Sequence, residues 1–277
     1  MTGIDELLAV MRRLRDPEHG CPWDIEQTFA TIAPFTIEEA YEVADAIARE
    51  DWDGLEGEVG DLLLQVVYYA QMADERGLFD FDRVARGIAA KMIARHPHVF
   101  GEDERRDIAG LHQVWEERKA AERRRRAEAG GGDTSALADV PVALPALTRA
   151  VKLQKRAARV GFDWPAPDPV VAKLREELAE LEAERERGDA AAIAAELGDV
   201  LFTAVNLARH LGVDPETALR DTNQRFERRF RRVEALAAAR GRAVEELGAE
   251  ALDALWEQAK AEERASPERP RPTVSHG

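Results

Sequence analysis

The chain has 277 residues, of which 45% are hydrophobic and 34% are charged, and its formal net charge at pH 7 is −15. This length suits one large domain or two ordinary ones, and the acidic balance argues against binding a nucleic-acid polymer, which needs a basic surface. Cys21 is the one cysteine, which excludes an intrachain disulfide and favours a cytoplasmic protein. The apolar runs are too short to span a bilayer, and the first residues do not fit a signal peptide.

Helical periodicity covers nearly the whole chain, because Ala, Glu, Leu and Arg dominate and apolar residues recur three and four positions apart. In the first half the pattern predicts helices over 3–15, 37–50, 54–76, 81–95 and 107–129. In the second half it predicts helices over 142–159, 169–187, 190–211, 215–240 and 248–264. Period-2 patterns that would indicate strands are missing, so the predicted fold class is all-α.

Three local signals indicate where helices start. Thr36 and Glu39, three residues apart, fit a capping box at the start of the second predicted helix. Asp168-Pro169 and Asp214-Pro215 each fit an N-cap followed by proline at the first helical position. These signals place one helix start in the first half and two in the second.

A small, polar and unpatterned segment, Gly130 to Ser135, predicts a flexible linker between two domains. We expect an N-terminal domain over 1–126, the linker over 127–141 and a C-terminal domain over 142–264. The proline-rich and charged stretch 265–277 is expected to be a disordered tail.

The strongest sequence signal is an internal repeat. Both halves carry Glu-Glu-x-x-Glu followed, at the same distance, by Glu-x-Gly-Asp. The acidic members are Glu38, Glu39, Glu42, Glu58 and Asp61 in the first half, and Glu176, Glu177, Glu180, Glu196 and Asp199 in the second. The repeat therefore predicts two copies of one helical module.

The spacing of these carboxylates predicts a metal site. Glu177 and Glu180 share one helix face, as do Glu196 and Asp199 on the next helix. The residues between the pairs allow a tight turn and an antiparallel return, so four carboxylates meet in one cleft. Their repulsion calls for a cation, and hard oxygen ligands favour Mg²⁺, with Mn²⁺ as a substitute, over zinc. The first half offers a second candidate set, which is Glu39, Glu42, Glu58 and Asp61.

The alternative is that these acidic faces are merely solvated, because glutamate is common on helix surfaces. Two observations favour use of the carboxylates. The pattern occurs twice, and Gly60 and Gly198 each stand inside a helix beside an acidic residue, at a cost of roughly 1 kcal/mol relative to alanine. Close approach of another helix or of a ligand would explain both glycines.

Other candidate residues would contact the substrate. Asn206 is either a satisfied core amide or a substrate contact, and Arg225 and Arg229 share a face that could bind phosphate oxygens. Lys155 belongs to a basic face that either binds phosphate or is solvated. Trp164 could stack on a base, although such an aromatic residue also serves as a core plug.

With these motifs the chain resembles the MazG family of the all-α nucleoside triphosphate pyrophosphohydrolase superfamily. The resemblance covers roughly residues 4–262 and rests on the doubled acidic pattern together with several segments. These are Gly20 to Asp24, Arg95 to Gly101, Lys155-Arg156, Val160 to Trp164, Asn206 to His210 and Asn223 to Phe230. It implies a tandem repeat of two MazG-like helical bundles and a homodimer. It also implies Mg²⁺-dependent cleavage of ribo- and deoxynucleoside triphosphates to monophosphate and pyrophosphate, in nucleotide-pool housekeeping.

The resemblance also implies roles for individual residues. The metal ligands would be Glu177, Glu180, Glu196 and Asp199, and Glu176 would orient water. The phosphates would be held by Lys155, Asn223, Arg225 and Arg229. The second repeat would be the hydrolytic one, since the first half has Ala89 and Tyr68 where the second has Asn223 and Asn206. The first half keeps all five acidic residues, so weak binding, a different substrate and dimerisation remain open for it.

Two other classes of protein compete with this interpretation. A di-iron carboxylate bundle is also all-α and Glu-rich, but it needs Glu-x-x-His pairs that the two acidic motifs lack. A non-catalytic helical interaction protein would merely solvate its acidic faces. A P-loop NTPase is excluded, because the sequence contains no Gly-x-x-x-x-Gly-Lys-Ser/Thr motif.

Overall fold

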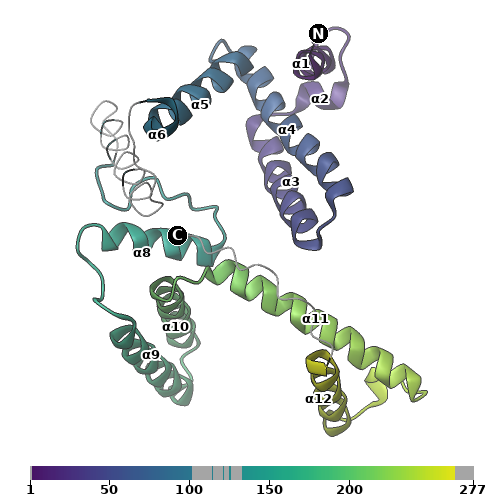
Figure 1. The fold of residues 1–277 in the computed structure, drawn as a ribbon, viewed down its shortest axis with the longest axis vertical. Coiled ribbons are helices and arrows are strands. Elements are labelled where there is room, and N and C mark those ends of the chain that lie inside the picture. Colours follow the sequence, from purple (N-terminus) through teal and green to yellow (C-terminus); the bar gives the residue numbers. More distant parts are fainter. Residues whose placement is uncertain (1, 102–113, 115–120, 122–124, 126–132, 266–277) are drawn as a thin grey trace. The chain divides into compact units, whose positions relative to one another are not determined.

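The computed structural model describes residues 2–101, 114, 121, 125 and 133–265, and within them every regular element is a helix (Figure 1). The predicted all-α class is therefore confirmed. The chain divides into two compact units, Met1–Leu111 and His112–Gly277. Most of the predicted helix over 107–129, the first part of the linker (127–132) and nearly all of the tail lie outside the described residues. The predicted domain boundaries stay a prediction.

The first unit is built around a helical hairpin. Its helices are α1 (Gly3–Leu14), α2 (Pro22–Glu26), α3 (Phe29–Arg49), α4 (Trp52–Asp74), α5 (Phe81–Arg95) and α6 (Pro97–Phe100). The long helices α3 and α4 pack along each other, and α1 lies against α4. The buried core consists of Met11, Ile32, Val67, Tyr68 and Met72. The short helices α2 and α6 were not predicted, since a single turn carries no periodic signal.

The second unit repeats the hairpin with α9 and α10. Its helices are α8 (Ala146–Ala158), α9 (Pro167–Arg187), α10 (Ala190–His210), α11 (Pro215–Ala239) and α12 (Ala249–Ala265), with a 3₁₀ turn η1 (Val244–Glu246). Helix α8 packs on α10, where the buried Gln154 donates to the Phe202 carbonyl at 2.8 Å. A separate cluster of Val233, Leu236, Ala237, Leu255 and Ala259 holds α11 and α12 together.

Among the described helices, α10 is the one long and apolar enough to cross a membrane by length and composition. It packs along α9 and carries Glu196 and Asp199. Carboxylates inside a bilayer span are costly and rare. Only 17% of its most apolar stretch is buried inside the structure, so the two carboxylates, and not burial, argue against a membrane span.

The predicted capping box at Thr36 is wrong. Helix α3 begins at Phe29, and its N-cap is Thr28, whose side chain accepts from the Thr31 backbone N–H. Thr36 therefore lies inside the helix, where its hydroxyl is 2.7 Å from the Tyr69 hydroxyl. Pro34 interrupts the local helix signal, but the packing of Phe29 and Ile32 into the core extends the helix through it.

The two predicted Asp-Pro starts have different outcomes. Asp214 caps α11 as expected, because its side chain accepts from the Thr217 backbone N–H at 2.9 Å. Asp168 does not cap α9, because the helix begins at Pro167 and Asp168 already lies within its first turn. The proline is already set for the first helical position, and Asp168 in the first turn still interacts favourably with the helix dipole.

Candidate metal centre and active site

Within each hairpin, a tight turn brings the acidic residues of the first helix next to those of the second. Helix α9 ends at Gly188, whose φ of 77° is left-handed, and Asp189 caps α10 by accepting from two backbone N–H groups. In the first unit Glu50 takes the same left-handed conformation, with a φ of 56°, and Asp51 caps α4. Both turns thus combine a left-handed residue with a capping aspartate.

The hairpin of the second unit brings three of the four predicted ligands together. Glu177, Glu196 and Asp199 each place a carboxylate oxygen within 4.8 Å of the others. Glu180, the fourth, lies beside them, since burial and the carboxylates of Glu177 and Glu196 raise its pKa above the ordinary value. Glu177 is buried, with 6% of its surface exposed. Three of the four predicted ligands therefore lie together, and the metal-binding role of all four stays a prediction.

Lys173 is a functional candidate that the sequence reasoning missed. Its Nζ lies 2.7 Å from Glu176 Oε1 and 2.9 Å from Glu177 Oε1. These two hydrogen bonds raise the pKa of Lys173 above its ordinary value. The signal was present in the sequence, because a lysine three and four residues before two glutamates shares their helix face.

The first unit holds a matching acidic group. Glu39, Glu42 and Glu58 place carboxylate oxygens within 4.8 Å of one another. Asp61 is close enough that, after burial, its charge is the largest cause of a raised pKa at Glu39. The buried Gln65 faces this group, with its amide nitrogen 3.5 Å from Glu39 Oε1. Both repeats thus gather carboxylates from the two helices of their hairpin, although the third member of the group is Glu42 in the first unit and Asp199 in the second.

The chemistry of both groups fits a hard divalent cation. All candidate atoms in them are carboxylate oxygens, and neither group includes a cysteine or histidine. Mg²⁺ is usually held by a few carboxylates while it keeps waters and reaches substrate phosphates. Glu42 and Asp199 are exposed, so solvent and a ligand can approach each group.

Asn206 is held in a polar network at the end of α10. It is buried, and its Oδ1 accepts from the Arg209 guanidinium, with Nε at 2.9 Å. Arg209 also binds Asp163 in the loop between α8 and α9. The core-amide interpretation of Asn206 therefore describes its observed contacts. In the same loop Trp164 is 38% exposed, so it is no core plug, and Lys155 is exposed on α8.

Arg229 on α11, a predicted phosphate ligand, binds a carboxylate of α12 in the structure. Arg229 Nε donates to Glu263 Oε2 on α12 at 2.6 Å, and its guanidinium lies over the Trp256 ring. Asn223 and Arg225 are exposed. Within the described residues, none of the three bonds to the acidic groups of α9 and α10. Their phosphate-binding role stays a prediction.

The suggestion that another helix approaches the two helix-internal glycines is wrong for the described part of the chain. A Cβ added at Gly60 or Gly198 would meet no atom within 4 Å. The space beside each glycine is open. A ligand or a second chain remains as the explanation for both.

Comparison with known proteins decides the family. Residues 27–100 and 166–233 both match the MazG nucleotide pyrophosphohydrolase domain. This chain belongs to the MazG family. It is 53% identical to the nucleoside triphosphate pyrophosphohydrolase of Escherichia coli (strain K12) over 265 residues, which are 95% of this chain and 99% of that protein. It is 43% identical to the nucleoside triphosphate pyrophosphohydrolase/pyrophosphatase MazG of Thermotoga maritima, over 93% of this chain and 95% of the relative.

A third relative shows that MazG-like chains also occur within longer proteins. The uncharacterized protein YabN of Bacillus subtilis is 42% identical over 93% of this chain, which covers 52% of the relative. The matches confirm the predicted family, the tandem all-α fold and an enzyme of this class. They therefore decide against a non-catalytic interaction protein. Each MazG match contains one hairpin and one acidic group.

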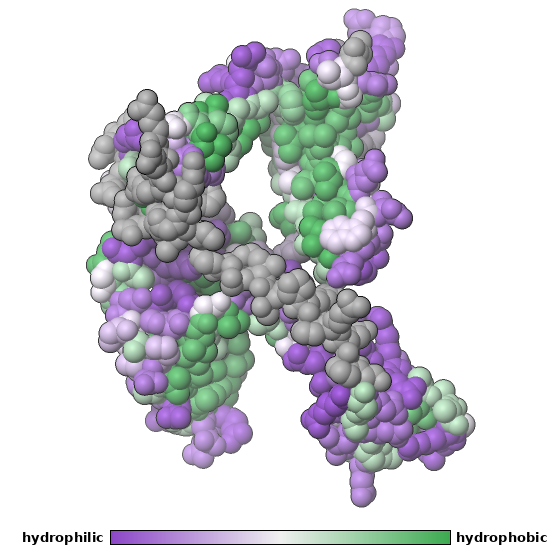
Figure 2. All heavy atoms as spheres, viewed as in Figure 1, coloured by the Kyte–Doolittle hydropathy of each residue, from purple (hydrophilic) through white to green (hydrophobic). Residues whose placement is uncertain are grey.

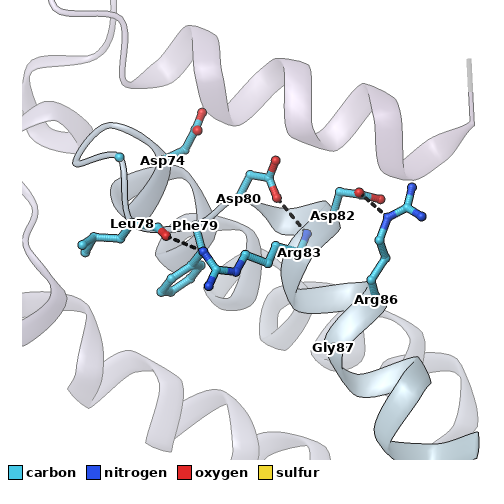
Figure 3. Close-up of a pocket in the computed structure, with 9 residues that line it drawn as sticks. Asp74, Leu78, Phe79, Asp80, Asp82, Arg83, Arg86 and Gly87 are labelled. Atoms are coloured by element: carbon cyan, nitrogen blue, oxygen red, sulfur yellow. Dashed lines mark hydrogen bonds and ion pairs between the residues drawn. The ribbon is translucent and has the colours of Figure 1, made fainter.

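An open pocket also lies at the α4–α5 turn of the first MazG domain (Figure 3). Both arginines that line it already have partners: Arg86 pairs with Asp82, and Arg83 donates to the Leu78 backbone carbonyl. None of the acidic-group residues lines this pocket. The two carboxylate groups are therefore the better candidates for chemistry.

Proposed function

We propose that this enzyme hydrolyses nucleoside triphosphates to the nucleoside monophosphate and pyrophosphate in a Mg²⁺-dependent reaction, with Mn²⁺ as a substitute metal. Ribo- and deoxynucleotides are both substrates, and the role is nucleotide-pool housekeeping in the cytoplasm. The observation that carries the proposal is the cluster of Glu177, Glu196 and Asp199 in the second MazG domain. The names of the Escherichia coli and Thermotoga maritima relatives support the reaction class.

The chain's own residues have distinct tasks in this reaction. Glu177, Glu180, Glu196 and Asp199 would hold the Mg²⁺, which would supply positive charge to neutralise the triphosphate and to activate water. Glu176, which is exposed beside the cluster, orients the attacking water toward the α-phosphorus. Water adds to the α-phosphorus, the bond between this phosphorus and the oxygen that bridges to the β-phosphorus breaks, and pyrophosphate leaves.

The triphosphate also needs positive partners, since its departing charge must be stabilised. Lys155, Asn223, Arg225 and Arg229 are proposed to hold the phosphates, and Asn206 and Trp164 to contact the nucleoside. Arg229 is bound to Glu263 in the structure, so binding phosphate means exchanging that carboxylate. The proposal therefore includes a rearrangement at α11.

A homodimer accounts for the apolar surface of the hairpins. Leu178, Leu197 and Leu201 on α9 and α10 are each about half exposed, at 48%, 47% and 52%. Figure 2 shows hydrophobic side chains gathered on this hairpin and on α3 and α4. Exposed patches of this kind mark protein interfaces.

In this proposal the first MazG domain is catalytically silent.

The test is product analysis with a panel of ribo- and deoxynucleoside triphosphates and Mg²⁺. Wild type is compared with Glu180→Gln and with its matched first-domain variant, Glu42→Gln; both side chains are exposed, so folding should persist. We expect monophosphate and pyrophosphate from wild type and Glu42→Gln, and at least a hundredfold slower turnover from Glu180→Gln, roughly the effect of losing one preorganised electrostatic group.

Two outcomes would contradict the proposal. Full activity in Glu180→Gln with loss in Glu42→Gln would move catalysis to the first domain. Labelled oxygen from solvent water in pyrophosphate, rather than in the monophosphate, would place the attack on the β-phosphorus.

A further inference from the structure

Lys173 supplies a positive charge inside the second acidic cluster. Among the described residues, it is the basic side chain that forms ion pairs with this cluster, through Glu176 and Glu177. Glu177 is buried, whereas the lysine side chain is 34% exposed. The ammonium group therefore reaches in from the rim and neutralises the deepest carboxylate.

The first MazG domain lacks this charge. Phe35 stands four residues before Glu39, as Lys173 stands four residues before Glu177. Phe35 packs edge-on against Trp23, with ring centroids 6.5 Å apart. Within the described residues no ion pair is formed by Glu39, whose carboxylate lies near the Gln65 amide and near the carboxylates of Glu42 and Glu58. The two domains thus share their carboxylates but differ in counter-charge.

A divalent cation and the Lys173 ammonium compete for the same carboxylate. Glu177 Oε1 lies 2.9 Å from Nζ, and Glu177 belongs to the group of three carboxylates that can hold the metal. A cation bound to Glu177 repels the ammonium beside it, so the two positive charges weaken each other's hold on Glu177. Glu176 lies outside that group, so Lys173 can keep Glu176 at 2.7 Å while it releases Glu177.

We propose that Lys173 is an internal counter-cation that weakens divalent-metal binding at Glu177 and positions Glu176 for the attacking water. The inference rests on the proposed function, because it assumes that the second cluster holds the metal. It assigns Lys173 two effects of opposite sign. The lysine lowers metal affinity, and it raises turnover once the metal is bound.

The experiment titrates Mn²⁺ into the full-length, metal-free protein at fixed pH and follows free Mn²⁺ by electron paramagnetic resonance. A background that combines Glu39→Gln, Glu42→Gln and Glu58→Gln removes the three carboxylates of the first group, so that the titration reports the second. Lys173→Met is compared with Lys173→Arg, which keeps the charge, and with Glu180→Gln. The matched control is Lys260→Met, because Lys260 pairs with Glu257 at 2.6 Å on α12, away from the cluster.

We expect Lys173→Met to bind Mn²⁺ roughly threefold to tenfold more tightly, a modest effect because the lysine is partly exposed. Its turnover at saturating metal should fall, whereas Lys173→Arg and Lys260→Met should resemble the parent in both measurements. Merely structural damage would weaken binding and turnover together. Equal or weaker Mn²⁺ binding by Lys173→Met would overturn the inference alone, whereas unchanged binding by Glu180→Gln would overturn the metal site as well.

Discussion

Replacing Arg15 with methionine tests how strongly one buried guanidinium holds the first unit together. Its Nε and Nη2 donate to the two oxygens of Glu75 at 2.8 and 2.7 Å. Its Nη1 donates to the backbone carbonyls of Asp24 and Gln27, which ties α2 to the end of α4. The Arg15 side chain is 8% exposed and that of Glu75 is 34% exposed.

The expected cost follows from these contacts. The ion pair contributes about 1 kcal/mol after discounting for the exposure of Glu75. The Gln27 carbonyl loses a donor, and the Asp24 carbonyl, which keeps the Tyr68 hydroxyl, loses one of its hydrogen bonds, at about 1 kcal/mol each. Together Arg15→Met should lower the free energy of unfolding by about 3 kcal/mol. In a unit of this size that corresponds to a melting temperature lower by roughly 10 to 20 °C.

The assay is thermal and urea unfolding of the full-length protein, with amide hydrogen exchange in α4 assigning the transition to the first unit. The matched control is Arg86→Met, because Arg86 also pairs with a carboxylate, that of Asp82, at 2.5 Å but its side chain is 79% exposed. The control should lose much less stability than Arg15→Met, because solvent screens an exposed ion pair. Equal losses in both variants would refute the argument that burial decides the contribution.

Two further predictions concern pH and helix stability. The Arg15 hydrogen bond lowers the pKa of Glu75 below its ordinary value of 4.5, so its stabilisation is complete above that pH and is lost as the pH falls through the folded-state pKa. Urea midpoints measured between pH 7 and pH 3 should therefore drop on acidification in wild type, and a drop of the same size in Glu75→Gln would contradict this assignment. Gly198→Ala should raise the free energy of unfolding by about 1 kcal/mol, because an added Cβ meets open space and alanine is the better helix former. A lower urea midpoint would instead mean that a ligand or a second chain occupies the space beside Gly198.

The sequence by itself determined most of the long helices and the doubled acidic pattern, but not the start of α3 or the short helices α2 and α6. The predicted helix over 190–211 agrees with α10, Ala190–His210, because its apolar periodicity is long and uninterrupted. Glu196 and Asp199 share a face for a reason of helix geometry alone, since residues three apart on one helix are neighbours. The exact repetition of this spacing in both halves indicated that the carboxylates serve a function. The structure brings carboxylates together in both units.

Contacts between elements were decided only by the tertiary structure. Thr36 lies within α3 because core packing extends that helix back to Phe29, against the local signal. Arg229 binds Glu263 because α12 folds against α11, which no spacing along α11 reveals. Sequence periodicity fixes which residues share a helix face, whereas the partner of that face depends on which helices pack together and how far they turn.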